Sequence, residues 1–144
     1  MPSTSLGLRY PAGTDSANIA QYFQNLATDV NTQIGPKGQL GLVAAAGWTT
    51  SNARYWKMAD GDVRLTGVMV NTSAFTPAGD LMATLPTGYR PIQDAVWPVF
   101  NSTTYACFVR VTTTGRVEAF RSAQNVSIGA SSGWTLDPIR FPTV

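Results

Sequence analysis

The stretch Asp15–Ile34, DSANIAQYFQNLATDVNTQI, decides how the chain is expected to fold, because it is the one segment with a clear helical pattern. Its first four apolar residues are spaced by four, three and four positions, which is typical of a coiled-coil seam. The seam residues are Ile19, Phe23, Leu26, Val30 and Ile34. Thr14 or Asp15 can cap the first turn, and Gly35-Pro36 ends the pattern. We therefore predict a helix over residues 14–34.

This helix has little stability of its own. It is rich in Asn and Thr, which are poor helix formers, and Asp15 and Asp29 are its only charged residues. A helix of about 20 residues with such a composition is marginal when isolated in water. Its apolar seam must be buried either against the rest of the chain or against copies of itself.

Composition restricts the class of protein. Of the 144 residues only 12% are charged, against about 25% in an average domain, and the net charge is +2 without a basic cluster. Nucleic-acid binding is therefore not expected. No apolar run approaches the roughly 18 residues of a membrane span, and the N-terminus lacks the layout of a signal peptide. A weakly charged surface rich in Thr, Ser and Gly is common among virion and extracellular assembly proteins.

The residues give no support for catalysis. Histidine is absent, which removes the usual general base and metal ligand, and Cys107 is the only cysteine. The alternation around Cys107 predicts a buried, inert thiol rather than a nucleophile. Asp60-Gly61-Asp62 is explained by turn chemistry and is too short for a calcium loop. We expect no enzyme activity, no catalytic residue, no metal and no cofactor.

Two further segments precede a β-rich region. Residues 1–13 form an irregular arm whose apolar residues Leu6, Leu8 and Tyr10 predict docking onto another protein. Residues 35–47 are rich in glycine, with Gly35, Gly38 and Gly41 spaced by three. This spacing fits a Gly/Pro linker, and a short three-chain neck is the alternative.

From residue 48 to residue 144 the pattern is that of short strands separated by turns. Asp60-Gly61 and Thr113-Thr114-Gly115 are hairpin signals, and Thr76–Gly79 is a turn. We predict an antiparallel sandwich or jelly roll, which leaves no second helix to cover the seam. The predicted strands are Arg54–Met58, Val63–Asn71, Asp80–Leu85, Asp94–Phe100, Thr104–Thr112, Arg116–Arg121 and Thr135–Phe141.

Most aromatic residues of this region are expected in the core or in a subunit interface. Tyr89 and Trp134 are predicted in turns, where they could stack on a sugar or pack on a neighbouring subunit. Arg90 lies in the turn Leu85–Pro91 and could bridge to a neighbour, although a structural role within one subunit is the simpler interpretation.

Several stretches together resemble the short appendage and tail-fibre proteins of tailed bacteriophages, notably minor tail proteins of actinobacterial phages. The N-terminal GLRYP at residues 7–11, followed by one helix, is similar to the opening of such proteins. The β region resembles trimeric fibre heads in four stretches, which are NARY (52–55), DGDVRLTG (60–67), LPTGYRP (85–91) and WTLDPIRF (134–141).

The resemblance implies a homotrimeric virion protein, made in the bacterial cytoplasm and displayed on the tail or capsid surface. Residues 14–34 would be the trimerisation helix, and residues 1–34 would contact other virion proteins. The β head would bind a receptor, with a host cell-surface glycan as the candidate ligand. A capsid decoration or minor capsid protein of the same build is the main alternative, and a free-standing carbohydrate-binding module is a further one.

Overall fold

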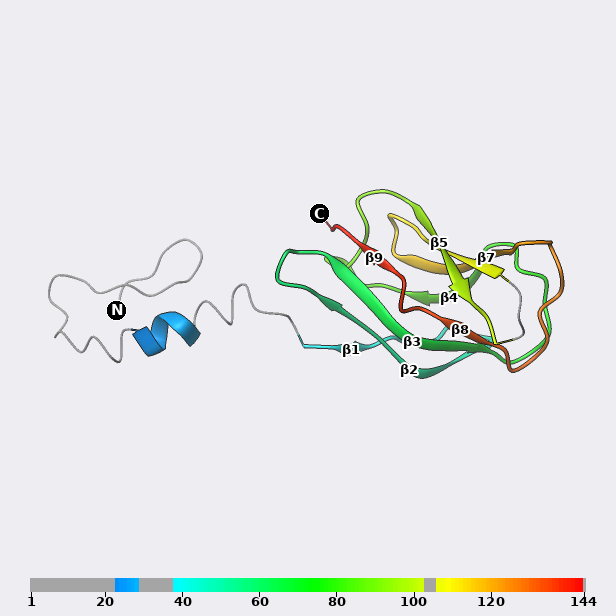
Figure 1. The fold of residues 1–144 in the computed structure, drawn as a ribbon, viewed down its shortest axis with the longest axis horizontal. Coiled ribbons are helices and arrows are strands. Elements are labelled where there is room, and N and C mark those ends of the chain that lie inside the picture. The colour runs from blue at the N-terminus through cyan, green and yellow to red at the C-terminus, as the bar shows by residue number, and fades with distance from the viewer. Residues whose placement is uncertain (1–22, 29–37, 103–105, 144) are drawn as a thin grey trace, which may run out of the picture. The chain divides into compact units, whose positions relative to one another are not determined.

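The computed structural model describes residues 23–28, 38–102 and 106–143. It divides the chain into two compact units, Met1–Lys37 and Gly38–Val144. In the first unit residues 23–28 are helical, and they fall inside the predicted helix (Figure 1). Phe23 is exposed and Leu26 is half-buried, whereas Ile19, Val30 and Ile34 lie outside the described residues. The arm residues Leu6, Leu8 and Tyr10 also lie outside them.

The second unit is built from β-strands, as predicted. Their bounds are β1 (Leu40–Gly41), β2 (Trp48–Lys57), β3 (Val63–Asn71), β4 (Asp80–Thr84), β5 (Ala95–Phe100), β6 (Ala106–Val111), β7 (Arg116–Ser122), β8 (Gly133–Thr135) and β9 (Arg140–Phe141).

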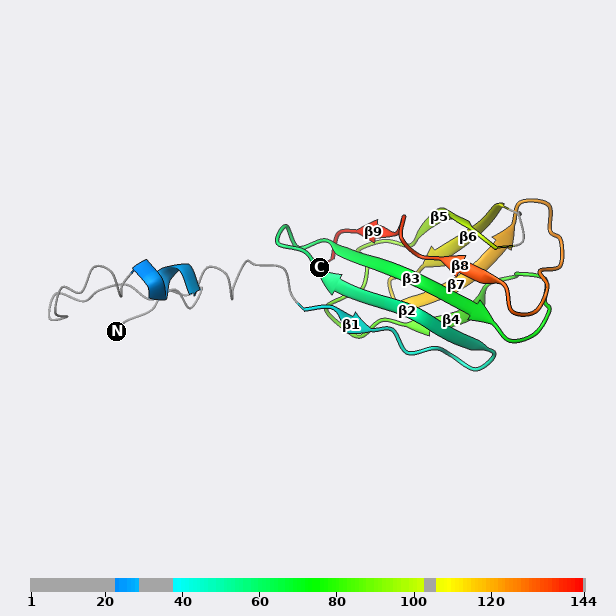
Figure 2. The ribbon, with the colours of Figure 1, turned by 60° about the horizontal axis from the view of Figure 1, so that its bottom comes forward.

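The strands form two antiparallel sheets that lie as two layers (Figures 1 and 2). The first sheet has the order β1-β2-β3-β8, and β9 also pairs with β3. The second has the order β4-β7-β6-β5, in which a meander of three strands is joined by β4 in a Greek-key arrangement. Apolar side chains from both sheets form one core, with Leu65, Met82, Val109 and Trp134 among its fully buried members.

A bulge in the first sheet lets two strands share one edge of β3. The register of β2 against β3 shifts between Ser51 and Arg54, so Asn52 and Ala53 lie opposite Gly67 alone. Asn52 has a φ of 53° and Gly67 a φ of 85°, and both residue types tolerate this left-handed region. Beyond the bend, Val68–Val70 pairs with β8, and before it Val63–Arg64 pairs with β9.

The turn between β8 and β9 is fastened to this bend by hydrogen bonds. The backbone N–H of Gly67 donates to Asp137 Oδ1 (3.0 Å), and that of Leu136 donates to the Gly67 carbonyl (2.9 Å). The Thr66 hydroxyl also donates to Asp137 Oδ1. These bonds hold the pKa of Asp137 below its ordinary value, with the Thr66 hydroxyl as the main cause.

The sequence-based strand assignments differ from the described structure by more than one residue in three places. β2 starts at Trp48 rather than Arg54. Leu40–Gly41, which was expected in the glycine-rich segment 35–47, pairs with Tyr55 and Arg54 of β2. The single strand predicted over Thr135–Phe141 is two strands, because Asp137 and Pro138 form the turn that crosses the bend in β3.

Candidate functional site

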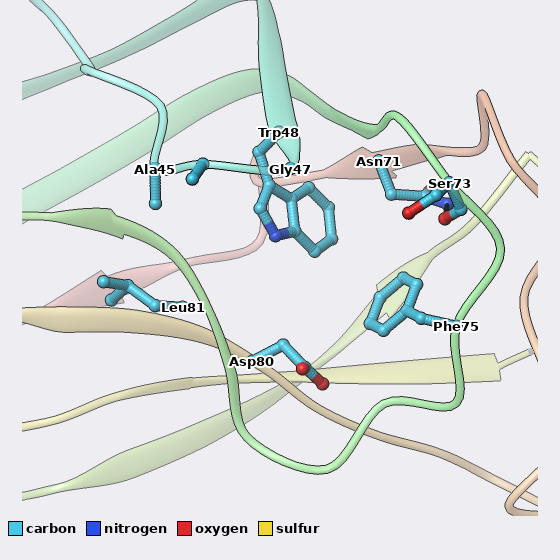
Figure 3. Close-up of a pocket in the computed structure, with 9 residues that line it drawn as sticks. Ala45, Gly47, Trp48, Asn71, Ser73, Phe75, Asp80 and Leu81 are labelled. Atoms are coloured by element: carbon cyan, nitrogen blue, oxygen red, sulfur yellow. Dashed lines mark hydrogen bonds between the residues drawn. The ribbon is translucent and has the colours of Figure 1, made fainter.

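A pocket of about 370 Å³ opens beside the start of β2 and the start of β4 (Figure 3). This volume is at the lower end of the range of small-molecule sites. Its lining residues come from the β1–β2 connection with the first residue of β2, the end of β3, the segment that follows β3, and β4. They are Ala45, Ala46, Gly47, Trp48, Asn71, Ser73, Phe75, Asp80 and Leu81.

Backbone hydrogen bonds fix the walls of the pocket. The N–H of Thr72 donates to the Gly47 carbonyl (2.9 Å), which ties the end of β3 to the turn before Trp48. The N–H of Ala45 donates to the Met82 carbonyl (2.8 Å), which joins the first sheet to β4. Phe75 exchanges two backbone hydrogen bonds with Ile128, at 3.0 and 2.7 Å. The pocket is therefore formed by paired backbone rather than by loose loops.

Two aromatic rings make the apolar wall. Trp48 and Phe75 meet edge to face, with ring centroids 5.4 Å apart at 83°. Trp134 lies behind them, 5.8 Å from Trp48 and 6.0 Å from Phe75. Trp48 is 8% exposed and Phe75 is half-buried, so both rings are anchored in the core while part of each borders the pocket. Figure 3 draws both rings and the side chain of Asp80 around the pocket.

Asn71 supplies a buried acceptor in the wall. The side chain is 2% exposed, and its Nδ2 donates to the carbonyls of Ser73 and Gly129, both at 2.8 Å. Its Oδ1 is buried and has no hydrogen-bond partner among the described residues. An unmet buried acceptor costs about 1–3 kcal/mol, so a donor that reached this atom would recover that free energy.

Asp80 is the one charged residue in the lining. Its side chain is exposed, and its Oδ2 accepts the backbone N–H of Ala78 at 2.9 Å, which closes the turn before β4. Arg110 lies beside the neighbouring Gly79 but is paired with Glu118 through Nη2 at 2.5 Å. The pocket therefore combines an apolar wall with a few polar groups and one carboxylate, and those polar groups are suited to a ligand that donates hydrogen bonds.

The residues predicted from sequence as ligand or subunit contacts are not part of this pocket. Tyr89 is half-buried and packs edge to face on Tyr55, with ring centroids 5.0 Å apart. Arg90 donates from Nε to the Leu85 carbonyl (3.1 Å), which is the intrasubunit role considered above. Trp134 is fully buried, so its ring is not presented to a ligand.

The lone cysteine and the acidic residues of the described ranges also bear on the sequence-based expectations. Cys107 is buried, as predicted, and burial raises the pKa of its thiol to about 11. No group of three or more His, Cys, Asp or Glu side chains that could hold a metal occurs in residues 23–28, 38–102 and 106–143. Within the same ranges no helix is long and apolar enough to cross a membrane.

Sequence reasoning missed the pocket because its residues are scattered. Trp48 and Phe75 were expected in the core or an interface, and Asp80 only as the start of a strand. Trp48 lies opposite Asn71 in the β2–β3 register, and the Ala45–Met82 backbone bond brings β4 to the same place. A hairpin signal at Asp60-Gly61 was the one feature of the sequence that pointed to this register.

Comparison with known proteins supplies one solved structure of similar fold. No family model matches the chain, and no curated protein matches it. A crystal structure of the receptor binding protein (gp15) of Listeria phage PSA superposes with a TM-score of 0.64. The two sequences are 16% identical, and the alignment covers 92% of this chain and 83% of the phage protein. At this identity the likeness establishes the shared fold.

Proposed function

We propose that the chain is a structural protein of a bacteriophage virion and acts as the receptor-binding head of a tail fibre. The observation that carries the proposal is the fold shared with the receptor binding protein of Listeria phage PSA over 92% of this chain. In this proposal the protein is a homotrimer with a jelly-roll head, anchored to the particle by its N-terminal region.

An apolar surface of the head supports self-association. In β5 the outward-facing residues are Val96, Pro98 and Phe100, and Phe100 is 81% exposed. Phe108 lies opposite Pro98 on β6 and is half-buried beneath the Arg121 guanidinium, which lies 5.1 Å from its ring. Large apolar side chains at the edge of a sheet are typical of surfaces that contact another protein.

Adsorption of the purified protein to cells is the first test. Fluorescently labelled full-length protein should bind the bacteria that the phage infects, and it should compete with the phage for adsorption. Antibodies against the β unit should label the tail in electron micrographs of the particle. If the cells bind no protein and the antibodies do not label the tail, the receptor-binding proposal is wrong.

The capsid is the alternative location. A decoration protein of the same build would be labelled around the head of the particle and would be present in several hundred copies, whereas a tail protein is present in a few to tens. Quantitative densitometry of virion protein bands separates these outcomes. Light scattering of the dilute protein tests the trimer, and a clean monomer would contradict it.

A further inference from the structure

We propose that the pocket between Trp48, Phe75 and Asp80 binds one uncharged sugar unit of a surface polysaccharide. The inference deepens the proposed receptor-binding function and rests on it, because it places the ligand contact on particular residues. The pocket is the place in the described structure where an aromatic wall, a carboxylate and an unpaired buried acceptor occur together.

The hydrogen-bonding groups of the pocket select the chemical class of ligand. Asp80 offers carboxylate oxygens, and one of them already accepts the Ala78 N–H. The Ser73 hydroxyl can donate or accept, whereas Asn71 Oδ1, which has no partner among the described residues, is buried behind the pocket surface and is reached only if the wall shifts. A ligand rich in hydroxyl donors matches this set, since each hydroxyl can meet an acceptor in the pocket.

The charge of the pocket argues against an anion. The lining contains one carboxylate and no cation, and the nearby Arg110 is paired with Glu118. A phosphate or carboxylate group in this pocket would face Asp80 without a neutralising partner, which is unfavourable at short range. The phosphodiester backbone of an anionic wall polymer is therefore a poor ligand, whereas an uncharged sugar attached to such a polymer is not excluded by charge.

The aromatic wall complements the apolar part of a sugar. A pyranose ring has faces made of C–H groups, and these pack well against aromatic carbon. Trp48 and Phe75 are held in place by the core and by the Phe75–Ile128 backbone bonds, so little side-chain freedom would be lost on binding. The volume of about 370 Å³ accommodates one sugar unit rather than a long oligosaccharide.

The binding experiment uses the full chain and defined probes. Glucose, galactose, rhamnose and N-acetylglucosamine are titrated separately while ligand-detected NMR follows saturation transfer from the protein. At least one of these sugars should bind with a millimolar dissociation constant, as expected for a single unit in a small pocket. Glycerol phosphate serves as an anionic probe and should bind at least about tenfold more weakly than the best sugar. A simple alkylammonium salt tests whether the charge of Asp80 alone is enough for binding.

Asp80→Asn is the main variant. It retains an oxygen to accept the Ala78 N–H, so the turn should be preserved, but it removes the charged acceptor. Sugar affinity should fall about tenfold. The matched control is Asp94→Asn, because Asp94 is likewise exposed and its Oδ1 accepts one backbone N–H, that of Thr113 at 2.7 Å, away from the pocket. Phe75→Leu should also weaken binding, and thermal unfolding of each variant checks its fold.

The outcomes separate this inference from the proposed function. If wild type binds host cells and Asp80→Asn binds them equally well, the receptor-binding function holds and the pocket assignment is wrong. If none of the four sugars binds, or the charged probes bind best, the ligand class is wrong. A structure of the assembled protein with a neighbouring subunit filling the pocket would also overturn the inference. If wild type binds sugar but not cells, the proposed function fails while the pocket assignment survives.

Discussion

Replacing Gly67 with alanine tests the bend on which the first sheet depends. Gly67 has a φ of 85°, and a Cβ atom there would lie 2.3 Å from the carbonyl oxygen of Asn52. It would also lie 2.6 Å from the Asn52 carbonyl carbon and 2.8 Å from the Ala53 Cα. All three neighbours are backbone atoms, so no side-chain rotation can relieve the contact.

The expected loss of stability has two parts. An alanine in the left-handed region costs about 1–2 kcal/mol relative to glycine. Moving the Asn52 carbonyl from 2.3 Å to the 3.4 Å at which ordinary contact begins forces the bulge to shift, at a cost of about 1–3 kcal/mol. The lower entropy of the unfolded alanine variant offsets up to about 1 kcal/mol of this. The free energy of unfolding should therefore fall by about 1–5 kcal/mol, a large share of the 5–15 kcal/mol typical of a domain.

Gly61→Ala provides the matched control for this variant. Gly61 has a φ of 89°, but a Cβ atom added there would meet nothing within 4 Å among the described residues. The control therefore carries the backbone cost without the close contact. Urea unfolding of both variants and wild type at one fixed protein concentration isolates the contact, which should account for about 1–3 kcal/mol. Equal stabilities of the two variants would refute the argument that β3 approaches the bulge closely at Gly67.

Three further predictions use other methods. Asp137→Asn should make the free energy of unfolding less dependent on acid pH. In the wild type the lowered pKa of Asp137 stabilises the folded state; this stabilisation is complete above the ordinary pKa of 3.8 and is lost as pH falls through the depressed pKa. Unfolding of both proteins at pH 6 and pH 2 measures the difference, and an equal loss of stability between the two pH values in variant and wild type would contradict it. The Cys107 thiol should react with a thiol reagent only after unfolding, because it is buried with a pKa of about 11, and rapid labelling of native protein would contradict this. Leu26→Asp should dissociate the proposed trimer, because three carboxylates would be buried in one layer of the seam, and an unchanged mass in light scattering would refute the seam.

The strands with strong local signals could be predicted from the sequence. β3 runs over Val63–Asn71, as predicted, because alternating apolar residues follow a clear Asp60-Gly61 turn. β5 tolerates Pro98 because it is an edge strand, pairing with β6 on one side, so the missing N–H breaks no ladder in the middle of a sheet.

The missed elements depend on long-range pairing instead. The first half of β2 contains Thr49, Thr50 and Ser51, whose exposed side chains show no apolar alternation, and it is a strand because β3 pairs with it. The two residues of β1 carry no local signal and depend on β2 in the same way. The homotrimer, its helical seam and the attachment role of residues 1–13 stay predictions. The resemblance to minor tail proteins of actinobacterial phages also stays a prediction.

The candidate site could not be predicted because no short motif encodes it. Trp48, Asn71, Phe75 and Asp80 each have a structural explanation when taken alone, and only long-range backbone pairing brings them together. Since backbone bonds hold the walls, a sugar would enter a preformed pocket and lose little free energy to ordering. The few polar groups still limit the affinity of one site to the millimolar range. Three such sites in the proposed trimer, engaging a repeating polysaccharide together, would raise the avidity by orders of magnitude without any new contact.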